Sequence, residues 1–199
     1  MVPAASLIRN IADLKGKRLG IAGGGLDKNW LLLRALAQKV DGLDFNQALI
    51  KIFAAPPLLN QQLEQGNLDA VLNYWNFAAK LEGMGYRKLL DGREILQKLG
   101  MTTEVPSLGY VFHESWAKGN TTSLMKFFEA SVKAKTAICR VDSVWQKIAS
   151  LTQESNEKVR QTLREHYCEG QTKSGGDSLE NAAAEIYQKI GRASCRERV

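Results

Sequence analysis

The sequence predicts an α/β fold that has a parallel sheet in its first half and a run of helices in its second half. Short apolar, β-branched segments alternate with amphipathic helical segments as far as about residue 112, and only helical periodicity follows. The chain has 199 residues, which is enough for one ordinary domain or two small lobes with a real core.

The first strand is expected over residues 17–22, where a short apolar run ends at a glycine loop. Asp27 is expected to cap the helix that follows, because its carboxylate can accept the exposed N–H groups of the first turn. The apolar spacing of that helix predicts a buried stripe of Leu32, Leu33, Leu36 and Val40.

The rest of the first half continues the alternation of strands and helices. Strands are expected over residues 49–53, 68–74 and 107–112, with a short one over 87–91. Helices are expected from Pro56 to about Gly66, over 76–84 and over 93–99. Strands separated by helices imply a parallel sheet with right-handed crossovers.

Four helices are expected after the last strand. Their apolar stripes comprise Leu124, Phe127, Phe128, Ala134, Ala137 and Ile138, then Trp145, Ile148 and Leu151, then Val159, Leu163 and Tyr167, and finally Leu179, Ala183, Ile186 and Ile190. Asp177 precedes Glu180 by three residues, which predicts a capping box. The sequence predicts no further strands that these four helices could cover. We therefore expect that the strands of their sheet are encoded upstream of Met1, and that the helices expose apolar faces in this chain.

Composition indicates a globular class and argues against several partners. Apolar residues make up 44% and charged residues 24% of the chain, and no apolar run is long enough to span a bilayer. The formal charge is +6, but part of it lies in the last residues, GRASCRERV, which resemble a foreign tail. The remaining basic residues are scattered among acids, so no nucleic-acid partner is predicted.

The cysteines and histidines predict no catalytic or metal site. Cys139 and Cys168 are too far apart for a CxxC motif, and Cys195 lies in the tail. A disulfide between Cys139 and Cys168 stays open, but two isolated thiols are the favoured expectation. His113 and His166 have no spacing suited to a metal, and no G-x-S-x-G motif is present. No cofactor is expected.

The glycine loop is best interpreted as a ligand cradle. It fails the dinucleotide pattern, because Ala22 stands where the second glycine is needed after Gly20, and it fails the P-loop pattern, because Leu26 follows Gly25. Ligands of parallel sheets bind at the carboxyl ends of the strands. The alternative, that the glycines only turn the chain and Trp75 only packs, stays open. The predicted ligand-binding residues are Gly24, Gly25, Leu26, Asp27, Lys28, Asn29, Ala55, Tyr74, Trp75 and Asn76.

Three stretches carry a family resemblance: IADLKGKRLGIAGGG, LLLRAL and QQLEQGNLDAVLNYW. Together they resemble the substrate-binding proteins of ABC importers in the nitrate, sulfonate and taurine group, which includes binders of thiamine-pyrimidine precursors. PSLGYVFHESWAKGN is similar to the family's return strand and the start of its next helix. The resemblance covers about residues 8–190.

The resemblance implies a type II periplasmic-binding-protein-like fold, in which two α/β lobes close about a hinge on a small solute. Residues 11–105 would form one lobe, after an inter-lobe segment at 1–10 and a truncated start. Residues 106–190 would supply the return strand and C-terminal helices of the other lobe, and 191–199 a non-native tail.

The same resemblance implies a solute receptor rather than an enzyme. It would act as a monomer with a membrane permease of an ABC importer, in the periplasm or anchored outside the cytoplasm, and the fragment would bind poorly. Two alternatives share the fold: an enzyme like the thiamine-pyrimidine synthases, and a ligand-sensing regulatory module.

One departure from the family bears on the ligand. Anion-binding members carry small hydroxyl residues in the loop, where this chain has Leu26 and Asp27. A carboxylate in contact with an anion costs roughly 1–4 kcal/mol, depending on the local dielectric. We therefore expect a neutral, cationic or mixed-charge organic solute.

Overall fold

The computed structural model describes residues 1–101, 105, 108–171 and 177–195. The chain divides into two compact units, and each is described by itself below. Unit 1 comprises Met1–Val105 with Ser174–Val199, and unit 2 comprises Pro106–Lys173. Among the described residues, no helix combines the length and the apolar character that crossing a bilayer requires.

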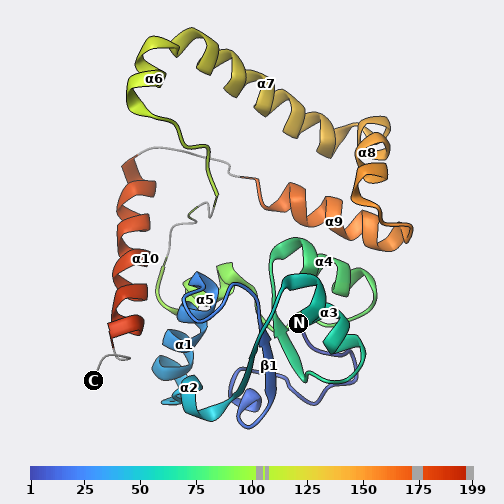
Figure 1. Ribbon diagram of the computed structural model, residues 1–199, viewed down its shortest axis with the longest axis vertical. Coiled ribbons are helices and arrows are strands. Elements are labelled where there is room, and N and C mark those ends of the chain that lie inside the picture. Colours follow the sequence, from blue (N-terminus) through green and yellow to red (C-terminus); the bar gives the residue numbers. More distant parts are fainter. Residues whose placement is uncertain (102–104, 106–107, 172–176, 196–199) are drawn as a thin grey trace. The chain divides into compact units, whose positions relative to one another are not determined.

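A three-stranded parallel sheet lies at the centre of unit 1 (Figure 1). Its strands are β1 (Arg18–Ile21), β2 (Ile50–Phe53) and β3 (Ala70–Leu72), in the order β2-β1-β3. Gly20 of β1 stands opposite Ile52 on one side and Val71 on the other. The predicted parallel arrangement is confirmed, and β1 is its middle strand.

Helices cover both faces of the sheet, because successive side chains of β1 point to opposite sides. Leu19 and Ile21 pack in one cluster with α1 (Lys28–Asp41), whereas Ala22 packs in the other with α3 (Pro56–Glu64) and α4 (Trp75–Gly83). A Cβ on Gly20 would lie only 2.6 Å from Leu68 Cδ1 and 2.9 Å from Leu59 Cδ2. A residue without a side chain is therefore needed there for α3 to approach the sheet closely.

The first helix is buried more widely than its predicted stripe. Leu32, Leu33 and Leu36 are buried as expected, and so are Trp30 and Ala37, because α5 (Gly92–Lys98) and α10 (Asp177–Cys195) pack against the helix as well. The prediction for Val40 was wrong: it is 59% exposed in the last turn, just before the helix ends at Asp41.

The last helix packs within unit 1. α10 buries Ala182 and Ile186 in a cluster with Met101. Its start at Asp177 agrees with the expected boundary, whereas the Asp177 side chain, and with it the predicted capping box, lies outside the described residues. The helix continues as far as Cys195, into the segment interpreted as a tail.

Some local predictions for unit 1 were wrong. Residues 88–91 form no strand, because Asp91 instead begins α5 through a capping box with Glu94. Only Arg87 makes an antiparallel bridge, and its partner is Val2. Two short helices were not predicted, η1 (Ala12–Leu14) and α2 (Phe45–Ala48).

Unit 2 is helical throughout its regular structure. It contains α6 (Glu114–Gly119), α7 (Thr121–Arg140), α8 (Asp142–Ala149), η2 (Ser150–Thr152) and α9 (Glu157–Glu169). The strand predicted over 107–112 was wrong for the described residues 108–112, which have no regular structure. The described part of unit 2 supplies no strand for them to pair with, and Leu108 and Val111 are 83% and 92% exposed.

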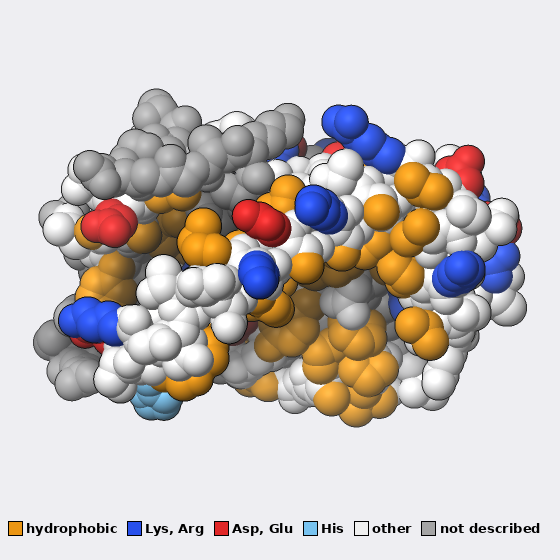
Figure 2. Space-filling model, turned by 90° about the horizontal axis from the view of Figure 1, so that it is seen from above, with side chains coloured by type: hydrophobic (Ala, Val, Ile, Leu, Met, Phe, Trp, Pro, Cys, Tyr) orange, Lys and Arg blue, Asp and Glu red, His pale blue; other side chains and the backbone are white. Residues whose placement is uncertain are grey.

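Apolar side chains of unit 2 are exposed, as the sequence predicted. Neither α6 nor α7 has a buried residue among those described. Five aromatic residues contact one another at the surface of the unit: Tyr110, Phe112, Trp116, Phe127 and Phe128. Figure 2 shows hydrophobic side chains interleaved with lysine and arginine on one face of the molecule.

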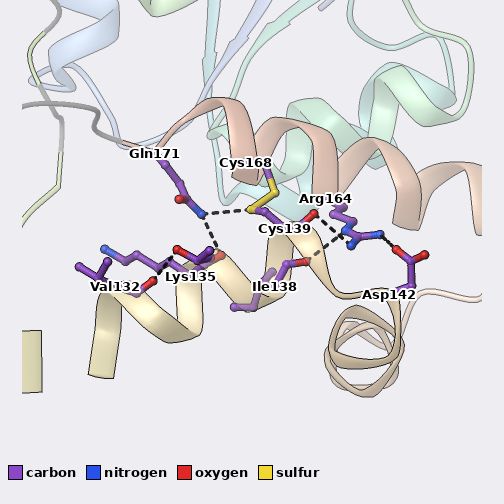
Figure 3. Close-up of a disulfide and its surroundings, with 9 residues drawn as sticks. Val132, Lys135, Ile138, Cys139, Asp142, Arg164, Cys168 and Gln171 are labelled. Atoms are coloured by element: carbon purple, nitrogen blue, oxygen red, sulfur yellow. Dashed lines mark hydrogen bonds and ion pairs between the residues drawn. A yellow bond between two sulfur atoms is a disulfide. The ribbon is translucent and has the colours of Figure 1, made fainter. Parts of the chain in front are cut away.

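The favoured expectation of isolated thiols at Cys139 and Cys168 was wrong. Cys139, in the last turn of α7, forms a disulfide with Cys168, in the last turn of α9 (Figure 3). Their Cα atoms are 5.8 Å apart, although 29 positions separate them in the sequence. The pairing follows from how these helix ends pack, and no local spacing pattern reveals it.

Candidate ligand-binding site

The predicted site lies where the three strands of unit 1 end. The connections from β1 to α1, from β2 to α3 and from β3 to α4 all leave the sheet at its carboxyl edge, because the strands are parallel. As β1 is the middle strand, its glycine loop lies between the other two connections. All ten predicted ligand-binding residues belong to these connections or to the first helical turns that follow them.

The glycine loop owes its shape to its first two glycines. Gly23 and Gly24 each have φ of +82°, a conformation that side chains disfavour. A Cβ on Gly23 would lie 2.8 Å from Asp27 Oδ2 and 2.9 Å from the Tyr74 hydroxyl. Gly23 is exposed, but its neighbours occupy the position that a Cβ would take, whereas Gly24 and Gly25 have open space there.

Asp27 caps α1 as predicted. Its Oδ1 accepts hydrogen bonds from the backbone N–H groups of Asn29, at 2.9 Å, and Trp30, at 3.1 Å. Two donors that an anion would need at this helix start are therefore already occupied by a carboxylate. The second oxygen, Oδ2, faces Gly23, on the side where the Tyr74 hydroxyl also lies.

Lys28 is partly buried beside this cap. Desolvation lowers the pKa of its ammonium group, and the Asp27 carboxylate partly opposes that shift. The charged form of Lys28, which could offset the negative charge of Asp27, is therefore less favourable than the charged form of an exposed lysine.

The connection from β2 offers few hydrogen-bond donors. Ala55 is the exposed N-cap of α3, and its side chain cannot cap. Pro56 and Pro57 follow in the first turn, and proline has no backbone N–H to give a ligand. Any contact made by this connection is consequently apolar or made through carbonyl oxygens.

Two asparagine side chains form a hydrogen-bond network that connects the segments at this edge of the sheet. Asn73 Nδ2 donates to Pro56 O and to Asn60 Oδ1, both at 2.9 Å, and Asn60 Nδ2 donates to Phe77 O at 2.9 Å. The network therefore joins the starts of α3 and α4. Sequence reasoning missed both residues; the available signal was a polar Asn60 beside Leu59 at a buried position of a helix.

The connection from β3 presents aromatic side chains. The strand predicted to reach Tyr74 ends at Leu72, and α4 begins at Trp75. Tyr74 is 41% and Trp75 47% exposed, and Asn76 is half-buried in the first turn. Leu26 on the neighbouring loop is 78% exposed. The edge thus combines an apolar, aromatic surface with one carboxylate.

One hollow in each unit is lined by other residues. An apolar cavity of about 40 Å³ in unit 1 is lined by core residues such as Leu19, Leu33 and Ile95. An open hollow of about 540 Å³ in unit 2 is lined by Val111, Phe112, His113 and Trp116. Neither is lined by a predicted ligand-binding residue, so the assignment of those residues stays a prediction.

Comparison with known proteins assigns the family. Residues 1–140 match the family described as NMT1/THI5 like. The chain belongs to this family. It is 36% identical, over 99 residues, to a protein of Escherichia coli (strain K12) named for binding aliphatic sulfonates, a match that covers 49% of this chain and 30% of that protein.

Solved structures show the same fold. The alkanesulfonate-binding protein SsuA from Xanthomonas axonopodis pv. citri, bound to MOPS, aligns with a TM-score of 0.64 at 20% identity, over 94% of this chain and 63% of that one. The periplasmic aliphatic sulphonate binding protein SsuA from Escherichia coli aligns with a TM-score of 0.65 at 21% identity, over 98% and 62%. The predicted periplasmic-binding-protein-like fold is confirmed, and this chain spans less than two thirds of each relative.

Proposed function

We propose that this chain belongs to a solute-binding receptor of an ABC importer and that unit 1 contacts the solute at the carboxyl edge of its sheet. The observation that carries the proposal is the family match, combined with a glycine loop, a helix start and exposed aromatic residues at that edge. The receptor binds without catalysis and delivers its solute to a membrane permease. Hinge closure and a monomeric state belong to the same proposal.

An extracytoplasmic location is part of the proposal. One of the aligned structures is described as periplasmic. Disulfides persist in oxidising compartments and are rare in the cytosol, and this chain pairs Cys139 with Cys168.

The ligand we propose is a small organic solute that carries an amine or another hydrogen-bond donor, with or without an anionic group. The relatives are named for binding sulfonates, but Asp27 places a carboxylate oxygen close to Gly23 in the loop, and the Tyr74 hydroxyl also lies close to Gly23. An ammonium group or a neutral donor satisfies that oxygen, whereas a simple anion is repelled by it. A zwitterion with both an ammonium and a sulfonate group meets both observations.

Calorimetry and thermal shift with the full chain test this proposal. We expect weak binding, because this chain spans less than two thirds of its relatives. An aminosulfonate or an amine should still bind more tightly, and stabilise the chain more, than an alkanesulfonate or nitrate of similar size, because the Asp27 carboxylate attracts a cation and repels an anion. Stabilisation by simple anions alone would contradict the ligand class. Failure of every sulfonate, nitrate, pyrimidine and amine to bind would contradict the assignment of a ligand-binding edge to this chain.

Asp27→Asn separates the two roles of the carboxylate. Asparagine caps helices about as well as aspartate, so the variant keeps the cap while it loses the charge. We expect roughly tenfold weaker binding of an amine and tighter binding of an alkanesulfonate, from a change of about 1–2 kcal/mol. Asp44→Asn is the matched control, because Asp44 caps α2 through Asn46 N before β2 begins, away from the carboxyl edge.

A further inference from the structure

The C-terminal end of α7 is held by side chains of α9 and of the residues after it (Figure 3). Arg164 Nε donates to Ile138 O at 3.1 Å, and its Nη2 donates to Cys139 O at 3.2 Å. The last carbonyl groups of a helix lack partners within the helix and carry its negative dipole end, so a guanidinium group is well suited to them. Arg164 Nη1 also pairs with Asp142, at the start of α8, at 2.7 Å.

A second side chain and the disulfide complete this junction. Gln171 Nε2 lies 3.2 Å from Lys135 O and 3.1 Å from Cys139 Sγ. Cys139 is bonded to Cys168, so one covalent bond and two polar side chains join the same two helix ends.

Apolar burial in unit 2 is scarce by comparison. Among its described residues, the buried apolar side chains are Ala149, Val159 and Leu163, and none of them belongs to α6 or α7. Along the 20 residues of α7, Met125, Phe127 and Val132 are 54%, 44% and 63% exposed. The helix therefore lacks the buried apolar stripe that usually anchors a helix of this length.

We infer that oxidation of Cys139 and Cys168 is a required step in the maturation of this chain, because the bond fixes the end of α7 to the end of α9, and the described residues of unit 2 bury little apolar surface there. In this step one thiolate attacks a sulfur of a donor disulfide and forms a mixed disulfide. The second thiolate then displaces the donor sulfur. The two cysteines lose two protons and two electrons, and the donor is released as two thiols.

The junction can also be reduced in the folded chain. Both cysteines are half-buried, so we expect a small thiol to reduce the bond without prior unfolding. Reduction breaks the covalent link between α7 and α9 but leaves the hydrogen bonds that Arg164 and Gln171 donate to α7. Unit 1 has its own buried core and contains neither cysteine, so it serves as an internal reference.

Thiol counting in the full chain, exported into an oxidising compartment or refolded with a disulfide donor, tests the pairing. After denaturation without a reductant, we expect an alkylating reagent to label one of the three cysteines, and after reduction all three. Cys195→Ser is the matched control: it should show no labelled cysteine before reduction and two afterwards. Three labelled cysteines in the oxidised wild-type chain, or labelling that Cys195→Ser does not lower, would overturn the inference.

Hydrogen exchange tests the structural consequence. Reduction of the wild-type chain should speed exchange of the amides in the last turns of α7 by more than tenfold, with no change in the amides of α1. The first melting transition should fall by about 10 °C, as removal of a disulfide from a small unit typically does. Cys139→Ser with Cys168→Ser should reproduce both changes without a reductant, and Cys195→Ser should leave both unchanged. Equal exchange in α7 before and after reduction would show that the bond does not anchor the helix.

Discussion

The two units of this chain are each stabilised by different interactions. Unit 1 buries a sheet between two apolar clusters, one around α1 and one around α3 and α4. Unit 2 buries few apolar side chains among its described residues and joins its long helices through a disulfide and an arginine cap. The comparison shows that regular helices alone do not define a core, because helix formation and burial are separate contributions to stability.

The largest expected difference between the units concerns a buried and an exposed aromatic residue. Trp30→Ala should lower the free energy of unfolding of unit 1 by about 3–5 kcal/mol, because Trp30 is 1% exposed and its loss leaves a cavity. Phe127→Ala, at a residue 44% exposed, should cost less than about 1 kcal/mol in unit 2. Urea unfolding followed by far-UV circular dichroism measures both values, and equal costs would show that unit 2 has a core of comparable strength.

The stability of unit 1 should depend on pH through the Met1 amine, because a charged group is costly where water is excluded. In the 199-residue polypeptide, desolvation of the Met1 amine, assisted by the positive charge of Arg87, lowers its pKa from 8.0 to about 5. Between these values the unfolded chain binds a proton that the folded chain does not, so stability falls as the pH falls from 8 toward 5. The loss from pH 8 to pH 6 should be about 2–3 kcal/mol.

Acetylation of the Met1 amine provides the control for that measurement. The amide keeps an N–H for Val71 O, which the amine contacts at 2.8 Å, but it does not titrate. The acetylated chain should therefore lose most of the pH dependence of urea unfolding between pH 8 and pH 6. A steep dependence that survives acetylation would assign the effect to another group.

Removal of a helix cap should have the smallest effect on the free energy of unfolding, and the effect should be equal in both units. Asp27→Ala removes the cap of α1, and Asn156→Ala removes the bond that Val159 N donates to the cap of α9 at 3.2 Å. Each should cost about 1 kcal/mol, because capping is local and does not depend on the surrounding core. Thermal unfolding measures both; a cost several times larger at Asn156 would mean that α9 depends on its cap to hold the junction with α7.

The sequence predicted most of unit 1 because its local signals agree with its tertiary packing. The glycine loop, the Asp27 cap and the alternation of strands and helices all appear in the structure. Exposure of Val40 could not be predicted, because helical periodicity does not show where the packing partner ends. Burial of Trp30 depends on helices that pack on α1 from distant parts of the chain.

Unit 2 was predicted less well, for a related reason. Residues 108–112 have the apolar composition of a strand but form none, because a strand requires a partner and the described part of unit 2 offers none. The disulfide escaped prediction because pairing depends on distance in space. At the candidate site, the sequence placed all ten residues on one edge of the sheet, but it did not reveal the Asn60–Asn73 network beneath them.

In that network, the residues that hold the edge in place differ from the residues that the edge exposes. Asn60 and Asn73 fix where α3 and α4 begin through bonds to backbone carbonyls, so they are indifferent to the side chains displayed above them. Leu26 and Trp75 are exposed and take no part in those bonds. Such an edge can be redesigned for a new analyte by exchanging its displayed side chains while the scaffold stays intact, which is the property that a biosensor module needs.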